Sequence, residues 1–164
     1  MRTEPLGSHH DRAAFHCGLS QLDEYFVRQA SQDVKRRVAA VFVLADENDP
    51  RRVIGYYTLS SFAVRPCGLP AELTKKLPRY PTVRATLIGR LARDVSYPGT
   101  GHLLLADALK RILASSGEVA SALVVVDAKD DQAAGFYRKF GFLPFHQEAR
   151  KLWLPMATVA AAVG

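Results

Sequence analysis

The chain has 164 residues, 48% of them hydrophobic and 23% charged, which is long and apolar enough for one folded domain and excludes a disordered protein. Its net charge of +6 and pI near 9.5 favour an anionic partner such as nucleic acid, a phosphorylated cofactor or an acidic protein. Two cysteines are too few for a disulfide scaffold, and no segment resembles a signal peptide or a membrane span, so we expect a cytoplasmic protein.

The first half of the chain predicts a helix followed by a strand pair. Apolar residues at spacings of three and four, with a capping-box pattern at Ser20 and Asp23, predict a helix over 20–34. The runs 37–45 and 52–60 predict strands, and the turn-rich DENDP between them predicts an antiparallel hairpin. A short helix over 68–77 and an extended LPRYPTV segment follow.

The second half alternates strands and helices. Its expected elements, in order, are a strand at 85–95, the glycine-containing SYPGTG, the helix HLLLADALKRILASSG, a buried strand at 122–127, a helix within 127–142, and two short strands at 141–146 and 149–156. The alanine-rich tail after 156 is expected to be flexible. This order predicts a single α/β domain over 1–164, with a core of about 15–156 and a mixed central sheet flanked by helices.

The glycine-containing segment before the central helix is a candidate anion site. Backbone N–H groups of Gly99, Thr100, Gly101 and His102 would face a diphosphate at the positive end of the helix dipole. An ordinary β-to-α turn is the alternative, and a Walker-type loop is excluded because no Gly-Lys-Ser/Thr follows. The histidines at 9, 10 and 16 lie close together without a zinc-binding motif, so we expect no metal.

The motifs and their order resemble the GNAT acyl-coenzyme A N-acetyltransferases. The family signature R/Q-x-x-G-x-G/A falls on Ser96, Gly99 and Gly101, with Ser96 where Arg or Gln is usual and about two residues fewer after Asp94. The resemblance is closest to the tRNA-acetylating toxins of bacterial toxin–antitoxin pairs. Six motifs in register carry it: Phe15, Cys17, Gly18, Leu22 and Asp23 of F-x-C-G-x-x-x-L-D, then GYYTLS (55–60), LPRYP (77–81), GRLARD (89–94), VDAKD (126–130) and FYRKFGF (136–142).

The resemblance implies acetyl-coenzyme A as co-substrate, bound where the central sheet splays. The residues it assigns to the cofactor are Leu91, Ala92, Arg93, Ser96, Gly99, Thr100, Gly101, His102, Ala133 and Phe136. It places Tyr137 as the acid that protonates the departing thiolate, since a phenol with a pKa near 10 stays protonated at neutral pH. Without the resemblance, the sequence favours a core tyrosine that packs beside Phe136 and Phe140.

No general base stands out. Asp94 and Asp127 are candidates by position, although each could cap or pair locally. A base is dispensable if the acceptor is an aminoacyl ester, because an α-amino group has a pKa of about 8 and is partly neutral. The basic residues could neutralise phosphates of a tRNA acceptor stem, with solvated surface charge as the alternative. The candidates for tRNA contact are Lys35, Arg36, Arg79, Tyr80, Arg84 and Arg90, and a structural role within its strand is the alternative for Arg90.

Three functions remain open from the sequence. The first is an acetyl-CoA-dependent toxin that acetylates the α-amine of aminoacyl-tRNA, with a ribbon-helix-helix antitoxin as partner and a homodimer as its assembly. The second is a GNAT enzyme acting on a small amine or a protein amine. The third, a non-catalytic basic binding module, leaves the motif around Tyr137 unexplained.

Overall fold

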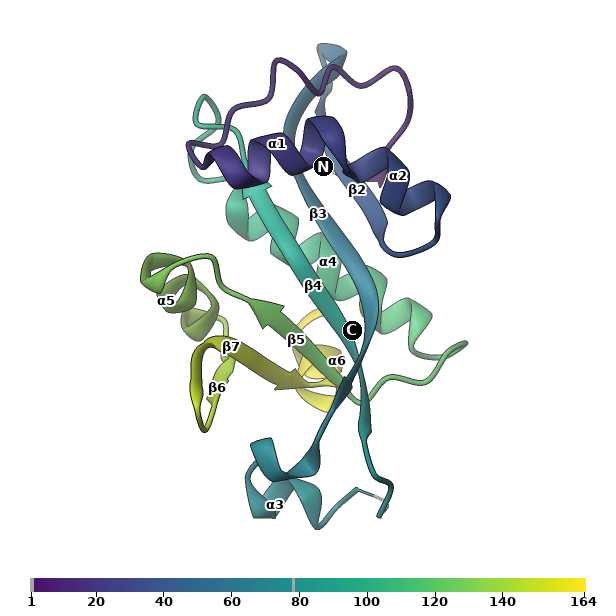
Figure 1. Cartoon of the computed structure of the whole chain (residues 1–164), viewed down its shortest axis with the longest axis vertical. Coiled ribbons are helices and arrows are strands. Elements are labelled where there is room, and N and C mark those ends of the chain that lie inside the picture. The colour runs from purple at the N-terminus through teal and green to yellow at the C-terminus, as the bar shows by residue number, and fades with distance from the viewer. Residues whose placement is uncertain (1, 78) are drawn as a thin grey trace. The chain divides into compact units, whose positions relative to one another are not determined.

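The computed structural model describes residues 2–77 and 79–164 and contains a seven-stranded mixed sheet flanked by helices (Figure 1). The strand order is β1-β2-β3-β4-β5-β7-β6, which confirms the predicted α/β class. The chain divides into two compact units. The first comprises Met1–Ser60 and Ile88–Ala108, and the second comprises Ser61–Leu87 and Leu109–Gly164.

The first unit packs two helices against an antiparallel strand set. Its elements are β1 (Glu4–Pro5), α1 (Ser20–Arg28), α2 (Ala30–Lys35), β2 (Ala40–Asp46), most of β3 (Asp49–Val64), the end of β4 (Val83–Arg93) and the start of α4 (Gly101–Ser115). Stacked and edge-on aromatic rings form its core, with Phe26 and Tyr56 at 4.3 Å between centroids and Phe15 beside both. Burial of these rings fixes α1 on the sheet.

The second unit contains the short helices η1 (Pro66–Gly68) and α3 (Ala71–Thr74), then β5 (Leu123–Asp127), α5 (Asp131–Lys139), β6 (Leu143–Phe145), β7 (Glu148–Pro155) and α6 (Met156–Val163). Strand β7 lies antiparallel to both β5 and β6, and α5 and α6 contact it. Strand β5 is buried at four successive positions, as its continuous apolar run predicts. Trp153 and Phe145 anchor the core.

The predicted helix over 20–34 is two helices. Its chain turns at Gln29, and the Arg12 guanidinium donates hydrogen bonds to the Phe26 and Val27 carbonyls, at 3.2 and 3.3 Å. A side chain from outside the helix thus contacts two carbonyls beside the break. Strand β3 has sixteen residues and is therefore longer at both ends than the predicted strand at 52–60.

The C-terminal tail differs from the expected flexible segment, because residues Met156–Val163 form α6. The Met156 N–H donates to the Ala122 carbonyl at 2.9 Å, and the Val159 side chain has no exposed surface. The buried Val159 docks this short helix, whose methionine and alanines favour the helical state. Among the described residues, no helix has the length and apolarity needed to cross a membrane.

Replacing Val159 by Ala should lower the free energy of unfolding by about 2 kcal/mol, because the change leaves a cavity under α6. Urea denaturation followed by circular dichroism measures it. Thr158→Ala, on the exposed face of the same helix, is the control and should change stability by less than about 0.5 kcal/mol. Equal effects of the two variants would mean that the tail does not contribute to the fold.

Candidate active site

The loop between β4 and α4 presents backbone donors that have no internal acceptor. Gly99 has a φ of +80°, and a Cβ placed there would meet nothing within 4 Å. The Thr100 hydroxyl donates to the Tyr97 carbonyl at 2.8 Å and does not cap α4. Across the part of the chain that the structure describes, the N–H groups of 99–102 form no hydrogen bond. The loop therefore has the donors that an anion at a helix N-terminus requires.

A buried carboxylate holds the start of this loop. Asp94 is 1% exposed, and its side chain accepts hydrogen bonds from the Ser96 N–H at 2.9 Å and the His16 N–H at 3.0 Å. Arg52 lies 3.8 Å away. Burial alone would raise the pKa of Asp94, but the Ser96 and His16 hydrogen bonds and the Arg52 charge outweigh it, so the pKa is lowered. This charged carboxylate accepts hydrogen bonds on both oxygens, so it has a structural role and is not available as a base.

Ser96, which stands where the signature usually has Arg or Gln, helps to hold the Asp94 carboxylate in place. Both its N–H and its hydroxyl interact with the Asp94 carboxylate. The next residue, Tyr97, donates its hydroxyl to Asp46 at 2.8 Å. The loop is therefore fixed at 96 and 97 through two carboxylates, and its unbonded N–H groups begin at Gly99.

Strand β4 leads into the loop and packs tightly within the first unit. A Cβ at Gly55 of β3 would lie 2.9 Å from the Ala92 carbonyl oxygen and 2.5 Å from Leu104 of α4. Only glycine fits at this contact, which brings β3, β4 and α4 together. Of the cofactor residues predicted on β4, Ala92 is buried, Leu91 is half-buried and Arg93 is exposed.

Tyr137 lies on the buried side of α5, where its ring is 4% exposed and packs edge-on against Phe136 and Phe142, at 5.4 and 5.6 Å. No residue within 2–77 or 79–164 hydrogen-bonds its hydroxyl. Burial raises the pKa of Tyr137, and the nearby Asp127 carboxylate raises it further. The hydroxyl is therefore protonated at any physiological pH and can donate its proton to a ligand.

Helix α5 begins at a defined position, which sets the orientation of Tyr137. The Asp130 carboxylate caps the helix by accepting from the Ala133 N–H at 2.8 Å. Ala133 and Phe136, both assigned to the cofactor, are half-buried on this helix. Asp127, the second candidate base, ends β5 half-exposed and lies 3.9 Å from Lys151.

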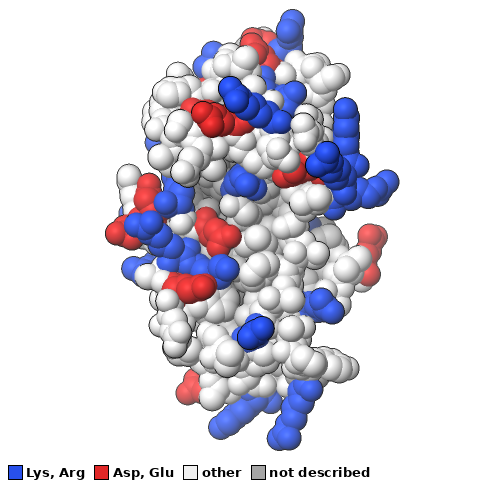
Figure 2. All heavy atoms as spheres, in the orientation of Figure 1, with Lys and Arg blue, Asp and Glu red and all other residues white. Residues whose placement is uncertain are grey.

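The predicted tRNA contacts are distributed over both units. Lys35 and Arg36 are exposed at the end of α2, and Figure 2 shows Lys and Arg spheres gathered there. In the second unit, Lys and Arg spheres also gather around α3 (Figure 2). Beside α3, Arg79 and Tyr80 are exposed and line a pocket of about 660 Å³, and Arg84 lines another of about 540 Å³. Pro78 of the same LPRYP motif lies outside the described residues.

Arg90 occupies a different environment from the other predicted contacts. Its guanidinium lies 3.6 Å from the centroid of the Tyr25 ring, whose hydroxyl donates to Asp33 at 2.8 Å. Its backbone N–H donates to the Thr58 hydroxyl at 3.1 Å. Such a stacked guanidinium stabilises the packing of α1 on the sheet. The sequence did not reveal this contact because Tyr25 and Arg90 are far apart in the chain.

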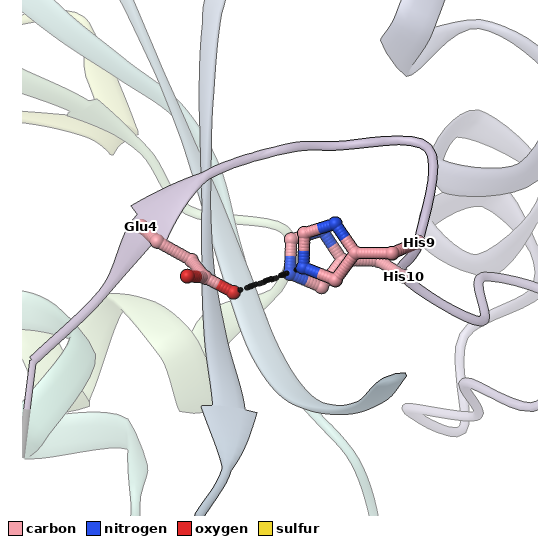
Figure 3. Close-up of side chains that lie close together, drawn as sticks. All are labelled: Glu4, His9 and His10. Atoms are coloured by element: carbon pink, nitrogen blue, oxygen red, sulfur yellow. Dashed lines mark hydrogen bonds and ion pairs between the residues drawn. The ribbon is translucent and has the colours of Figure 1, made fainter. Parts of the chain in front are cut away.

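The one group of candidate metal ligands among the described residues is Glu4, His9 and His10, whose ligand atoms lie within 4.8 Å of one another (Figure 3). The Gly7 N–H donates to His10 Nδ1 at 2.9 Å, so Nε2 carries the ring proton and donates to Glu4 at 2.7 Å. A metal ion bound to His10 Nε2 would have to displace the only proton of that ring. Because Nδ1 is already an acceptor, the bound imidazole would be left without any proton, which is unfavourable. The group is therefore a hydrogen-bonded anchor for the N-terminal segment, and His16 bonds Asp23 instead.

Replacing Asp94 by Asn should lower the free energy of unfolding by about 2 kcal/mol at pH 7, because one of the two N–H donors loses its charged acceptor. The folded-state pKa lies below the ordinary 3.8, so this contribution is present above about pH 4 and lost as pH falls through the folded pKa. Urea denaturation between pH 3 and pH 7 measures the difference, with exposed Glu47→Gln as the control. A difference that is independent of pH would contradict the assignment.

Comparison with known proteins identifies the family. No protein-family model matches the chain. The chain is 32% identical to a probable toxin TacT of Sinorhizobium fredii, over 98% of this chain and 94% of that protein. It is 28% identical to a tRNA-acetylating toxin of Mycobacterium tuberculosis, over 94% of this chain and 91% of that one.

Solved structures give the same result for the fold. AtaT complexed with acetyl-methionyl-tRNAfMet has a TM-score of 0.89 at 26% identity, over 99% of this chain and 98% of that chain. AtaTR bound with acetyl-CoA has a TM-score of 0.85 at 26% identity, over 99% and 97%. A tyrosine-to-phenylalanine mutant of the AtaT toxin, bound to the C-terminus of the antitoxin AtaR and acetyl-CoA, has a TM-score of 0.81 at 22% identity, over 98% and 96%. The chain belongs to the GNAT-fold family of tRNA-acetylating toxins.

Proposed function

We propose that this chain is an acetyl-CoA-dependent N-acetyltransferase toxin that acetylates the α-amine of aminoacyl-tRNA and thereby blocks translation. The carrying observation is similarity along nearly the whole chain to toxins of this activity, one of them solved with acetyl-methionyl-tRNA. The residues that this chemistry needs are present: a loop with unbonded N–H groups and a protonated tyrosine hydroxyl.

The loop after β4 would hold the diphosphate of acetyl-CoA. The N–H groups of 99–102 lie at the N-terminus of fifteen-residue α4, so the helix dipole adds to their attraction for an anion. Backbone groups of Leu91 and Arg93 would bond the pantetheine amides. We assign the cofactor to the same set as the sequence does: Leu91, Ala92, Arg93, Ser96, Gly99, Thr100, Gly101, His102, Ala133 and Phe136. Within this set, Ser96 acts through Asp94 and positions the loop.

Acetyl transfer then needs three events. The neutral α-amine attacks the thioester carbonyl carbon, and the negative charge that develops on the carbonyl oxygen is stabilised by a main-chain N–H near Ala92. The carbon–sulfur bond breaks as the intermediate collapses. Tyr137 donates its proton to the leaving sulfur, and the amine nitrogen, which has formed the amide bond, loses its extra proton to water.

A dedicated base is not required for this substrate. Asp94 is buried and occupied by two N–H donors, which removes it from the candidates. An aminoacyl ester has an α-amine with a pKa of about 8 or below, so a useful fraction is neutral at pH 7.5. Asp127 instead contributes by raising the pKa of Tyr137, which keeps the acid protonated.

The tRNA and the protein partner would bind through exposed surfaces. Lys35, Arg36, Arg79 and Arg84 are exposed cations able to contact phosphates, and Tyr80 offers an exposed ring for stacking on an unpaired base. Arg90 would contribute through its packing on Tyr25. We further propose that residues 1–164 form a single N-acetyltransferase domain. By resemblance to this family, we also propose a ribbon-helix-helix antitoxin as its partner, a homodimer as its assembly and the cytoplasm as its location.

The direct test is incubation of the protein with radiolabelled acetyl-CoA and charged total tRNA. Label should appear in tRNA and disappear after mild alkaline hydrolysis of the aminoacyl ester. Label that appears only on free amines or peptides would overturn the proposal.

Tyr137→Phe should lower kcat by about 10²- to 10⁴-fold with little change in KM, since the ring and its packing remain but the proton donor is lost. Single-turnover acetylation and thermal melting measure activity and fold. Tyr80→Phe is the matched control and should keep its activity because an exposed ring is retained. A Tyr137→Phe variant with undiminished turnover would remove Tyr137 from the chemistry.

The affinity for aminoacyl-tRNA should fall steeply with salt, and Arg79→Ala should reduce the slope of log K against log[salt] by about one. Filter binding between 50 and 300 mM KCl measures this slope. Lys110→Ala, an exposed cation outside the proposed set, should leave the slope unchanged. Identical slopes for wild type and Arg79→Ala would place this arginine away from the RNA.

A further inference from the structure

Arg52 of β3 is a cation to which the proposed reaction gives no role. Its side chain is half-buried, and its Nε atom is buried without a hydrogen-bond partner among the described residues. Its Nη2 atom lies 3.8 Å from the Asp94 carboxylate, which is an ion pair but is too long for a hydrogen bond. A guanidinium presents several N–H donors, and those of a half-buried side chain are normally paired. The donors of Arg52 are therefore available to a ligand.

Arg52 lies beside the loop that follows β4, within the same compact unit. Its Cζ atom is 5.7 Å from the centroid of the Tyr97 ring. The Tyr97 carbonyl accepts a hydrogen bond from the Thr100 hydroxyl at 2.8 Å. Tyr97 therefore contacts both Arg52 and a residue of the 99–102 segment, whose N–H groups are unbonded.

Carboxylates and arginines lie together at the start of this loop. Asp94 accepts hydrogen bonds from two backbone N–H groups, and Asp46 accepts from the Tyr97 hydroxyl at 2.8 Å. Arg93 donates to the Asp94 backbone carbonyl at 3.4 Å. Neither carboxylate accepts a hydrogen bond from Arg52. The carboxylates thus balance the positive charge of Arg52 without occupying its donors.

The first signature position of the loop is not free to bind a ligand. Ser96 stands where Arg or Gln is usual, and both its N–H and its hydroxyl interact with Asp94. Arg52 comes from a different strand and has a longer side chain. A guanidinium also forms paired, charge-assisted hydrogen bonds with phosphate oxygens. Arg52 can therefore supply a side-chain donor that Ser96 does not.

We propose that Arg52 binds a phosphate group of acetyl-CoA, next to the backbone donors of 99–102. The inference rests on the proposed function, because it takes acetyl-CoA as the co-substrate. The guanidinium donates no hydrogen bond within the described chain, so it can turn toward a phosphate without breaking one. Its contact with the Tyr97 ring would limit how far it moves.

Isothermal titration calorimetry with acetyl-CoA tests this role. Arg52→Gln should weaken the affinity by about 10- to 100-fold, as expected for the loss of a charge-assisted pair. Arg52→Lys keeps the charge beside Asp94 and should weaken it less. Arg51→Gln removes the same charge from the neighbouring exposed residue and should change the affinity by less than about threefold. Thermal melting of the ligand-free variants measures whether the fold is retained.

Ligands that differ in phosphate content separate a phosphate contact from a general effect on the loop. If the effect of Arg52→Gln disappears with acetyl-dephospho-CoA, Arg52 binds the 3′-phosphate. If it persists there but is absent with S-acetylpantetheine, Arg52 binds the diphosphate. Equal affinities of wild type and Arg52→Gln for acetyl-CoA, or an equal loss of affinity for S-acetylpantetheine, would overturn the proposal.

These titrations contain no tRNA, so they also separate the two proposals. Phosphate-dependent binding through Arg52 without acetylation of any aminoacyl-tRNA would contradict the proposed reaction and support the role of Arg52. Acetylation of aminoacyl-tRNA by wild type, together with an Arg52→Gln variant that keeps its affinity for acetyl-CoA, would support the reaction and overturn the role of Arg52.

Discussion

The candidate site depends on one buried carboxylate. Asp94 ends β4, and its two oxygens accept from a residue of the following loop and from a residue near the N-terminus, nearly eighty positions away. Buried charges are stable only when such partners compensate the loss of hydration. The Asp94 N–H also donates to the Ile54 carbonyl at 2.7 Å, which ties the same residue to β3. Three segments of the first unit therefore meet at one residue, and the geometry of the loop follows from it.

Tyr137 depends on a different physical effect. Its ring packs among aromatic neighbours, and its hydroxyl has no hydrogen-bond partner within the described chain. A hydroxyl without a partner within the described chain is a group that a ligand atom could satisfy. Burial and the Asp127 charge act in the same direction and keep the proton on the oxygen. The ring therefore provides packing, and the hydroxyl has no partner among the described residues.

The order of elements could be predicted from the sequence, since each helix and strand carries its own period, and the similarity to known toxins confirms the family. The environment of single side chains could not. Arg90 is a candidate RNA contact in the sequence, with a structural role in its strand as the alternative, and only the structure shows that it stacks on Tyr25. The alanine-rich tail is expected to be flexible, yet Val159 is buried in the core. Asp94 was a candidate base by its position in the sequence. Its structural role could not be predicted, because the hydrogen bond from the remote His16 leaves no local sequence pattern. Such contacts are tertiary, and neither composition nor period encodes them.

The most direct measurement is mass spectrometry of nuclease-digested tRNA after reaction with the protein and acetyl-CoA. The account predicts an acetyl group on the α-nitrogen of the amino acid still esterified to the terminal adenosine, formed by wild type and formed far more slowly by Tyr137→Phe. An acetyl group on a nucleobase, or equal yields from the two proteins, would contradict it.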